Sequence, residues 1–439
     1  MSSEVEAHII RKYEIQTQLG KGAYGIVWRA VDRRTKQVVA VKKIFDAFQN
    51  STDAQRTFRE VMFLQSLKHD NIIKLLNVHR ADNDKDIYLA FEFMETDLHA
   101  VIRAHILEDV HKQFIIYQLL RTLKYLHSAE ILHRDMKPSN LLLNSDCLMK
   151  VADFGLARSI LMLEKEQAAK PILTDYIATR WYRAPEILLG STKYTKGVDM
   201  WSVGCIIGEL ILEKPIFPGN STINQLERIV AVVGRPSPQD LAATNSNFAE
   251  AMLESVGRIV PKTFQDLCPK ASPEAIDLMM SLMKFNPNER MSAEQALNHP
   301  YVAGFHNPRD EPSAPGPITI SLPDDTRYTV SEYREKLYAE IAASKKRSER
   351  RELPAVGRPL ASAGGSAGPS RQANGSAYGS PTPANSQTSA YPRSTTSASG
   401  QARVSSGVGE RRTTSSSNLA QQRTSAAGVQ PRPASKGPL

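Results

Sequence analysis

The stretch "ILHRDMKPSNLLLN", residues 131–144, sets Asp135, Lys137 and Asn140 within six residues. A further acid, Asp153 of "VADFGLAR", follows later in the chain. Phosphoryl transfer needs such a set: a carboxylate that accepts a hydroxyl proton, an ammonium near the moving phosphate, and carboxylate and amide oxygens for Mg²⁺. The stretch follows a segment whose apolar residues recur at the spacing of one helix face. These residues are Ile116, Leu119, Leu120 and Leu123.

The N-terminal part favours strands. "YEIQTQLGKGAYGIVWRAV" and "QVVAVKKI" show alternating apolar positions and β-branched residues on either side of turn residues, which predicts antiparallel pairing. Gly20, Gly22 and Gly25 form a G-x-G-x-x-G pattern inside the first hairpin. A dinucleotide-binding fold needs this pattern between a strand and a helix, so that fold is excluded, and a plain flexible hairpin is the alternative.

A buried ion pair is predicted between two of the following segments. Residues 54–69 read as a helix in which Glu60 shares one face with apolar residues. A buried carboxylate without a partner costs several kcal/mol or shifts its pKa. Lys42, at the end of the strand "VAVK", is the candidate partner, and its ammonium could also meet nucleotide phosphates.

Composition separates the end of the chain from the rest. Residues 353–439 contain nine Lys and Arg but one acid, and almost no large aliphatic residues, so we predict a disordered tail that carries most of the net charge of +9. The three cysteines are scattered, which suggests a reducing compartment. No apolar run is long enough to span a bilayer, and the N-terminus lacks a signal pattern. We expect a soluble, cytoplasmic protein.

Taken together, these motifs resemble the eukaryotic protein kinases. The resemblance implies an α+β bilobal fold with a β-rich N-lobe over residues 11–94 and a mainly helical C-lobe over 95–305. Residues 1–10 would form an N-terminal extension, residues 306–352 an extension that packs on the kinase and ends in a basic helix, and residues 353–439 the tail. ATP and Mg²⁺ are the implied cofactors.

The resemblance also assigns roles to single residues. Asp135 would be the catalytic base, with Lys137 and Lys42 beside the phosphates, while Asn140 and Asp153 would bind Mg²⁺. Glu186 of "APE" would pair with Arg290 as a structural ion pair. The implied ATP-binding residues are Gly20, Lys21, Gly22, Gly25, Val27, Ala40, Lys42, Glu60, Phe91, Glu92 and Met94.

The stretch "ILTDYIATRWYRAPE", residues 172–186, is similar to the dual-phosphorylation lip of the MAP kinases, with Thr174 and Tyr176 as the phosphosites. Each phosphate brings about −1.5 to −2 charges and can order a loop by recruiting arginines. Arg59, Arg134 and Arg158 match the family positions around the phosphothreonine, and Arg180 and Arg183 those around the phosphotyrosine. The lip type implies Ser or Thr followed by Pro as substrate.

Within that family the chain resembles the atypical extracellular-signal-regulated kinases seven and eight, which have long C-terminal tails. Phe91 stands at the gatekeeper position, and residues 324–341 resemble the helix that follows the kinase domain in this branch. The acidic docking patch is thinned to Asp310 and Glu311, with Asn307 where other members have Asp, so docking of basic peptides is in doubt. By analogy we expect autophosphorylation of the lip and a link to basal bodies, cilia or the nucleus.

Two other classes of protein, a pseudokinase scaffold and a cyclin-dependent kinase, are the alternatives to an active MAP kinase. A pseudokinase scaffold predicts the loss of Lys42, Asp135 or Asp153, and all three are present. A cyclin-dependent kinase would need a cyclin-reading helix motif, which "AQRTFREVMF" lacks. The basic tail could bind an adaptor or an acidic cytoskeletal surface, but its few aromatic residues argue against nucleic acid. We expect a monomer that acts on protein substrates.

Overall fold

The computed structural model describes residues 5–22, 25–167, 179–322, 326 and 328–352. The chain divides into two units, Met1–Arg358 and Pro359–Leu439, and the second lies wholly outside the described residues. The lip phosphosites Thr174 and Tyr176 and the predicted disordered tail also lie outside them.

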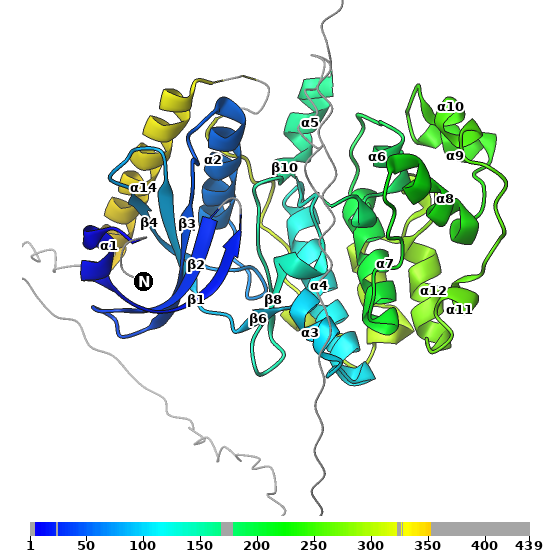
Figure 1. Ribbon diagram of the computed structural model, residues 1–439, viewed down its shortest axis with the longest axis horizontal. Helices are drawn as coiled ribbons and strands as arrows, with labels where there is room; N and C mark the ends of the chain where they lie inside the picture. The colour runs from blue at the N-terminus through cyan, green and yellow to red at the C-terminus, as the bar shows by residue number, and fades with distance from the viewer. Residues whose placement is uncertain (1–4, 23–24, 168–178, 323–325, 327, 353–439) are drawn as a thin grey trace, which may run out of the picture. The chain divides into compact units, whose positions relative to one another are not determined.

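The N-lobe is built on a five-stranded antiparallel sheet in the order β1-β2-β3-β5-β4, as the strand patterns predicted (Figure 1). Two helices accompany it, and Asn50 caps the longer one by accepting a hydrogen bond from the Asp53 amide. The elements are α1 (Ala7–Lys12), β1 (Tyr13–Gly22), β2 (Gly25–Asp32), β3 (Val38–Ile44), α2 (Ser51–Ser66), β4 (Leu75–Arg80) and β5 (Ile87–Glu92).

The two faces of this sheet belong to different hydrophobic clusters. Successive side chains of a strand point to opposite faces, and on β5 Tyr88 and Ala90 join one cluster while Leu89 and Phe91 join the other. The first cluster includes Ile9 of α1, so the N-terminal extension is part of the lobe's core. The second continues into α2 and the C-lobe. The face that carries Phe91 therefore faces the functional site.

The C-lobe is mainly helical, as predicted. Its central helices are α4, which carries the four apolar residues expected on one face, and α7, which is buried on nearly all sides and contains Trp201. The helices are α3 (Leu98–Ala104), α4 (Asp109–Ser128), α5 (Ile160–Gln167), α6 (Pro185–Leu188), α7 (Gly197–Leu212), α8 (Thr222–Val233), α9 (Pro238–Ala243), α10 (Ala249–Glu254), α11 (Phe264–Leu267), α12 (Pro273–Leu282) and α13 (Ala293–Leu297).

Short strands hold the segments that carry the predicted catalytic residues. One small sheet has the order β6-β8-β9, and a second pairs β10 with β7. The loop after β7 contains Asp135, and the loop between β9 and β10 contains Asp153. Their bounds are β6 (Thr96–Asp97), β7 (Ile131–Leu132), β8 (Leu141–Leu143), β9 (Met149–Val151) and β10 (Arg158–Ser159).

The C-terminal extension returns to the N-lobe as helix α14 (Val330–Glu352), which lies beside α2 (Figure 1). Tyr333 packs on Phe58 of α2 with ring centroids 5.7 Å apart, and Tyr338 packs on Phe48 at 6.2 Å. The helix that carries Glu60 is thus supported from outside the kinase domain.

The described residues contain no helix that is long and apolar enough to cross a membrane. All three cysteines are free thiols.

Candidate active site

The predicted pair between Lys42 and Glu60 is present: Lys42 Nζ lies 3.0 Å from Glu60 Oε1. β3 and α2 bring the two residues together, since α2 packs on the sheet face that carries Lys42. The Lys42 side chain keeps 31% exposure while the Glu60 side chain keeps 8%. Burial raises the pKa of Glu60, with Lys42 opposing the rise, whereas Glu60 and Asp153 together outweigh burial and raise the pKa of Lys42. The ammonium therefore stays charged with one side toward solvent.

The catalytic-loop residues form one hydrogen-bonded group. Lys137 Nζ lies 2.6 Å from Asp135 Oδ2, and Asn140 Nδ2 donates to the same oxygen at 3.1 Å and to the Asp135 carbonyl at 2.8 Å. The 3-10 helix η2 (Pro138–Asn140) turns the chain so that Asn140 faces back to Asp135. This leaves the amide oxygen of Asn140 available as a ligand.

Asp153 adopts a left-handed backbone conformation, with φ of 63°. Such a conformation costs about 1–3 kcal/mol for a residue other than glycine and is found most often at functional sites. Burial opposes ionisation of Asp153, but Lys42, His133 and Lys137 outweigh it and lower its pKa. The Asp153 carboxylate is therefore held ionised by the positive charges of Lys42 and Lys137.

A buried acid on α7, Asp199, was missed by the sequence analysis and supports the catalytic loop. Its Oδ2 accepts from the His133 amide and from His127 Nε2, both at 3.0 Å, and its Oδ1 accepts from the Arg134 amide at 2.9 Å. Arg134 has a positive φ of 68° and directly precedes Asp135. The available signal was an acid within the apolar run "VDMWSVGCII", which requires buried partners.

Residues predicted around the nucleotide share one face of the N-lobe sheet. Val27 is the cross-strand partner of Lys42, and Ala40 is the partner of Phe91. Cross-strand partners point to the same face, and Ala40 and Lys42 are two residues apart on β3. These four side chains therefore line the side of the sheet to which Glu60 also points.

The three glycines of the first hairpin differ in their surroundings. A Cβ added to Gly20 or Gly22 would meet no atom of the described residues within 4 Å, whereas one added to Gly25 would lie 2.1 Å from the Lys43 carbonyl oxygen. The pairing of β2 with β3 therefore requires glycine at position 25. The presence of Gly25 has this structural explanation whether or not the residue also contacts the nucleotide. Lys21 between the first two glycines is exposed, at the end of β1.

After β5 the chain crosses to the C-lobe through Glu92 and Met94. The Glu92 carboxylate pairs with Lys150 Nζ at 3.0 Å and accepts from the Lys74 amide at 2.8 Å. Met94 is buried in the core that the lobes share. Because the Glu92 side chain is occupied, a nucleotide would meet the main chain of this residue.

Three predicted phosphate-reading arginines come from different elements around the catalytic loop. Arg59 on α2 and Arg158 on β10 are buried, and the Arg134 guanidinium lies 4.1 Å from the Tyr194 ring centroid. Arg134 also donates from Nη1 to the Leu156 carbonyl. Guanidinium groups bind phosphates through charge-assisted, often bidentate hydrogen bonds, so these residue types suit the predicted role.

Of the two arginines predicted to bind the second phosphate, Arg183 lies in the same cavity lining as Asp135. Arg180 belongs to the 3-10 helix η4 (Arg180–Tyr182), and Arg183 follows it. Arg183, Arg134 and Asp135 line one cavity. The lip residues that these arginines would bind are outside the described residues.

The predicted pair between Glu186 and Arg290 is present and bidentate, with Arg290 Nη1 and Nη2 donating to the two carboxylate oxygens at 2.7 and 2.6 Å. Arg290 also donates to the carbonyl oxygens of Gly197 and Phe285. A fully buried pair with its remaining donors satisfied holds the segment after the lip to the base of α7.

The docking patch is thinner than the sequence indicated. Glu311, counted there as an available acid, is buried, with its Oε1 accepting from the Asn307 amide at 3.0 Å and facing His306 Nδ1 at 2.8 Å. Its Oε2 lies 3.6 Å from Lys124 Nζ. Of the two acids counted in the thinned patch, Asp310 is exposed and Glu311 is buried, which adds to the doubt about docking of basic peptides.

These donor groups fit ATP with Mg²⁺. Asp153 is ionised and Asn140 has a free amide oxygen, which are ligand types that Mg²⁺ prefers. Lys42 and Lys137 supply positive charge at the same site. The arrangement can hold a triphosphate and place an acceptor hydroxyl beside Asp135.

Comparison with known proteins gives a family match. The model described as "Protein kinase domain" matches residues 13–302, well over half of the chain. Extracellular signal-regulated kinase 2 of Dictyostelium discoideum is 63% identical over 354 residues, which cover 80% of this chain and 96% of that relative.

Two further relatives are longer than the part they share with this chain. Mitogen-activated protein kinase 15 of Xenopus laevis is 55% identical over 345 residues, covering 78% of this chain and 59% of the relative. Extracellular signal-regulated kinase 7 of Drosophila melanogaster is 45% identical over 340 residues, covering 76% and 37%. The chain thus spans less than two thirds of the length of these two.

Proposed function

The chain belongs to the protein kinase family as a MAP kinase, a proline-directed serine/threonine kinase, and we propose that it activates itself by phosphorylating Thr174 and Tyr176. The observation that supports this proposal is a cavity that Arg134, directly before Asp135, and Arg183, directly after η4, line together with Asp135. Two phosphates on the lip would offset their charge.

In the proposed mechanism, Asp135 accepts the proton of the substrate hydroxyl. Lys137 and Asn140 hold its carboxylate in place, and Asp199 holds the backbone that precedes it. Asn140 and Asp153 are the residues that would hold Mg²⁺, which offsets phosphate charge when bound.

Lys42 would orient the nucleotide phosphates, and Glu60 keeps its ammonium in place. Since α14 packs on α2, the C-terminal extension contributes to this geometry. Lys137 would lie near both the transferred phosphoryl group and Asp135. Its positive charge would stabilise the negative charge on the phosphoryl oxygens in the transition state.

Activation is proposed to follow from new charge-assisted hydrogen bonds. Arg59, Arg134 and Arg158 would bind the phosphate on Thr174, and Arg180 and Arg183 the phosphate on Tyr176. Each such bond contributes about 1.5–3 kcal/mol, so a few are enough to convert a mobile loop into a fixed one.

Expression in bacteria, where no MAP kinase kinase is present, tests the self-activation. Mass spectrometry should find phosphate on Thr174 and Tyr176 in the wild type and on neither in Asp135→Asn. An unphosphorylated wild-type lip would contradict autophosphorylation and would require a separate upstream kinase.

A double-mutant cycle tests the arginine assignment. Tyr176→Phe and Arg183→Ala should give non-additive losses of activity, because the first removes the phosphate and the second removes the arginine that binds it. Arg228→Ala, on the exposed side of α8, is the control and should combine additively with Tyr176→Phe. Additive losses with Arg183→Ala would show that Arg183 does not read the phosphotyrosine.

A role at the basal body or cilium stays a prediction that rests on the family branch. Imaging of the tagged chain in ciliated cells checks it, and exclusion from basal bodies would contradict it.

A further inference from the structure

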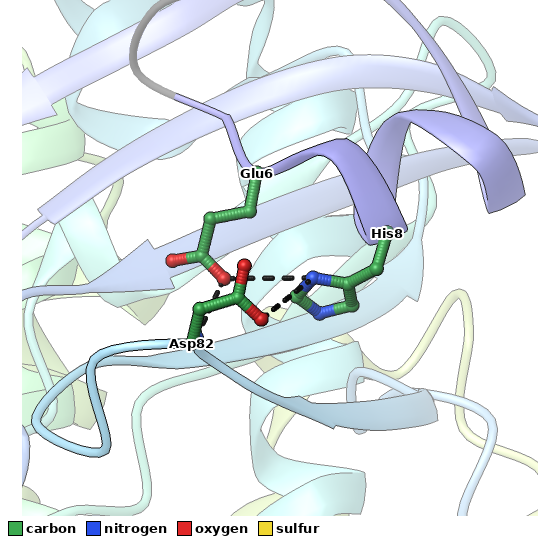
Figure 2. Close-up of side chains that lie close together, drawn as sticks. All are labelled: Glu6, His8 and Asp82. Carbon is green, nitrogen blue, oxygen red and sulfur yellow. Dashed lines mark hydrogen bonds and ion pairs between the residues drawn. The ribbon is translucent and has the colours of Figure 1, made fainter.

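Three possible metal ligands that take no part in the candidate active site meet at the edge of the N-lobe. Glu6 and His8 come from the start of the chain and α1, and Asp82 comes from the loop between β4 and β5 (Figure 2). One ligand atom from each lies within 4.8 Å of the others. We call these residues the Glu6–His8–Asp82 cluster.

The hydrogen bonds of His8 define which ring nitrogen is free. Nε2 lies 2.9 Å from the Arg80 carbonyl oxygen. Because a carbonyl can only accept, Nε2 must carry the hydrogen, and in the neutral ring Nδ1 then carries a lone pair. Nδ1 is buried, makes no hydrogen bond to any residue that the structure describes, and faces both carboxylates (Figure 2). A lone pair aimed at two anions is unfavourable unless Nδ1 carries a proton or a metal ion lies between the three groups.

The distances favour a metal ion over a proton. His8 Nδ1 lies 3.6 Å from Glu6 Oε2 and 3.4 Å from Asp82 Oδ1. An N–H···O hydrogen bond has its donor and acceptor about 2.7–3.2 Å apart, so both separations are too long for a shared proton. A tetrahedral ion with bonds of about 2.0–2.1 Å holds its ligand atoms about 3.3–3.4 Å apart, which is close to what is observed.

The surroundings of the cluster resemble the support that metal ligands need. A histidine that binds a metal usually donates its other ring hydrogen to a carbonyl or carboxylate, as His8 does to Arg80. Glu6 Oε2 also accepts from the Asp82 amide at 2.8 Å, which fixes one ligand through the backbone of another. Lys43 Nζ lies 3.5 Å from the opposite oxygen of Glu6 and leaves Oε2 to the cluster.

We propose that the Glu6–His8–Asp82 cluster binds a Zn²⁺ ion that joins the N-terminal segment to the β4–β5 loop. One imidazole nitrogen and two carboxylate oxygens form a ligand set that suits zinc, whereas Mg²⁺ and Ca²⁺ prefer oxygen alone. The Asp82 side chain is 76% exposed, so the fourth position is open to water. This site is separate from Lys42 and Asp135 and does not depend on the proposed lip activation.

Zinc titration of the purified full chain tests the site. The protein is first treated with a chelator and then titrated calorimetrically with Zn²⁺ in excess Mg²⁺, so that the oxygen ligands of the active site are already occupied. We expect one zinc per chain, a rise in Tm, and, with Co²⁺ in place of Zn²⁺, the visible absorption of a tetrahedral ion. Ca²⁺ should produce none of these.

Two variants assign the binding to the cluster. His8→Gln keeps a donor for the Arg80 carbonyl but lacks the ring nitrogen, and Asp82→Asn changes a side chain that is 76% exposed. Each should weaken zinc binding by more than about 10–100-fold. His105→Gln is the matched control, because His105 also faces a carboxylate, Glu213, but belongs to no described group of three ligands.

The outcomes separate loss of the site from loss of folding. In chelator, Asp82→Asn should have the Tm and kinase activity of the wild type, so its missing zinc response would reflect the ligand alone. The proposal is overturned if the wild type binds no zinc, or if His8→Gln and Asp82→Asn bind it as tightly as the wild type does.

Discussion

Asp199→Asn should damage the catalytic loop without touching a residue that contacts substrate. The Asp199 carboxylate is 1% exposed and accepts three hydrogen bonds, from the His133 and Arg134 amides and from His127. An asparagine has one acceptor oxygen, so its NH₂ group must face at least one of these donors. If the NH₂ group takes the Oδ1 position, the Arg134 amide loses its acceptor and the strain of its positive φ is no longer offset; if it takes the Oδ2 position, the His133 amide loses its acceptor.

The size of the effect follows from the bonds lost. A hydrogen bond to a charged group contributes about 1.5–3 kcal/mol, and a buried donor left unpaired costs about 1–3 kcal/mol. The free energy of unfolding should therefore fall by about 3–5 kcal/mol. Because Asp135 follows Arg134, a displacement of about 1 Å would lower kcat by roughly 100-fold. KM for ATP should change little, since Lys42 and Glu60 lie on other elements.

Asp277→Asn is the matched control. Asp277 also accepts from a histidine, His299, at 2.9 Å, but its side chain is 73% exposed, so the change should cost less than about 1 kcal/mol. Urea unfolding and peptide kinetics compare the two variants. Equal stability losses, or an unchanged kcat in Asp199→Asn, would refute the role given to Asp199.

Two further predictions concern pH and the nucleotide pocket. Burial, aided by Arg121 for His69 and Lys12 for His79, lowers the pKa of both histidines to about 4, against about 6.5 when unfolded. Protonation thus favours the unfolded chain as pH falls below about 6.5, at a cost of about 2 kcal/mol per histidine at pH 5. Urea unfolding at pH 7 and pH 5 checks this, and no difference would contradict it. Phe91→Gly should cost about 3–5 kcal/mol through its cavity yet admit bulky ATP analogues that raise Tm, whereas a variant that shows no analogue-dependent rise would exclude the pocket interpretation.

The sequence predicted several of the side-chain pairs that the structure brings together, because chemistry restricts which residue types can serve phosphoryl transfer. Asp135, Lys137 and Asn140 lie in one short segment, and their types and spacing are readable without a structure. The Lys42–Glu60 pair was also predictable, since a carboxylate on an apolar helix face requires a partner.

Other features depend on contacts between distant segments. Gly25 is fixed by a carbonyl of the neighbouring strand, which becomes visible only once the register of β2 and β3 is known. Glu311 lies in a polar stretch, so the sequence suggested an exposed acid. In the structure the side chain is buried and its two oxygens face His306 and Lys124. The support of α2 by α14 depends on where the chain returns after the C-lobe.

The most direct test of the account compares Asp135→Asn with the wild type on paired peptides that differ only in Ser-Pro or Ser-Ala. We expect the wild type to transfer phosphate to the Ser-Pro peptide and to act far more slowly on the Ser-Ala peptide. Asp135→Asn should transfer almost no phosphate to either peptide, although it still binds ATP. Substantial turnover by Asp135→Asn, or equal rates of the wild type on both peptides, would contradict it.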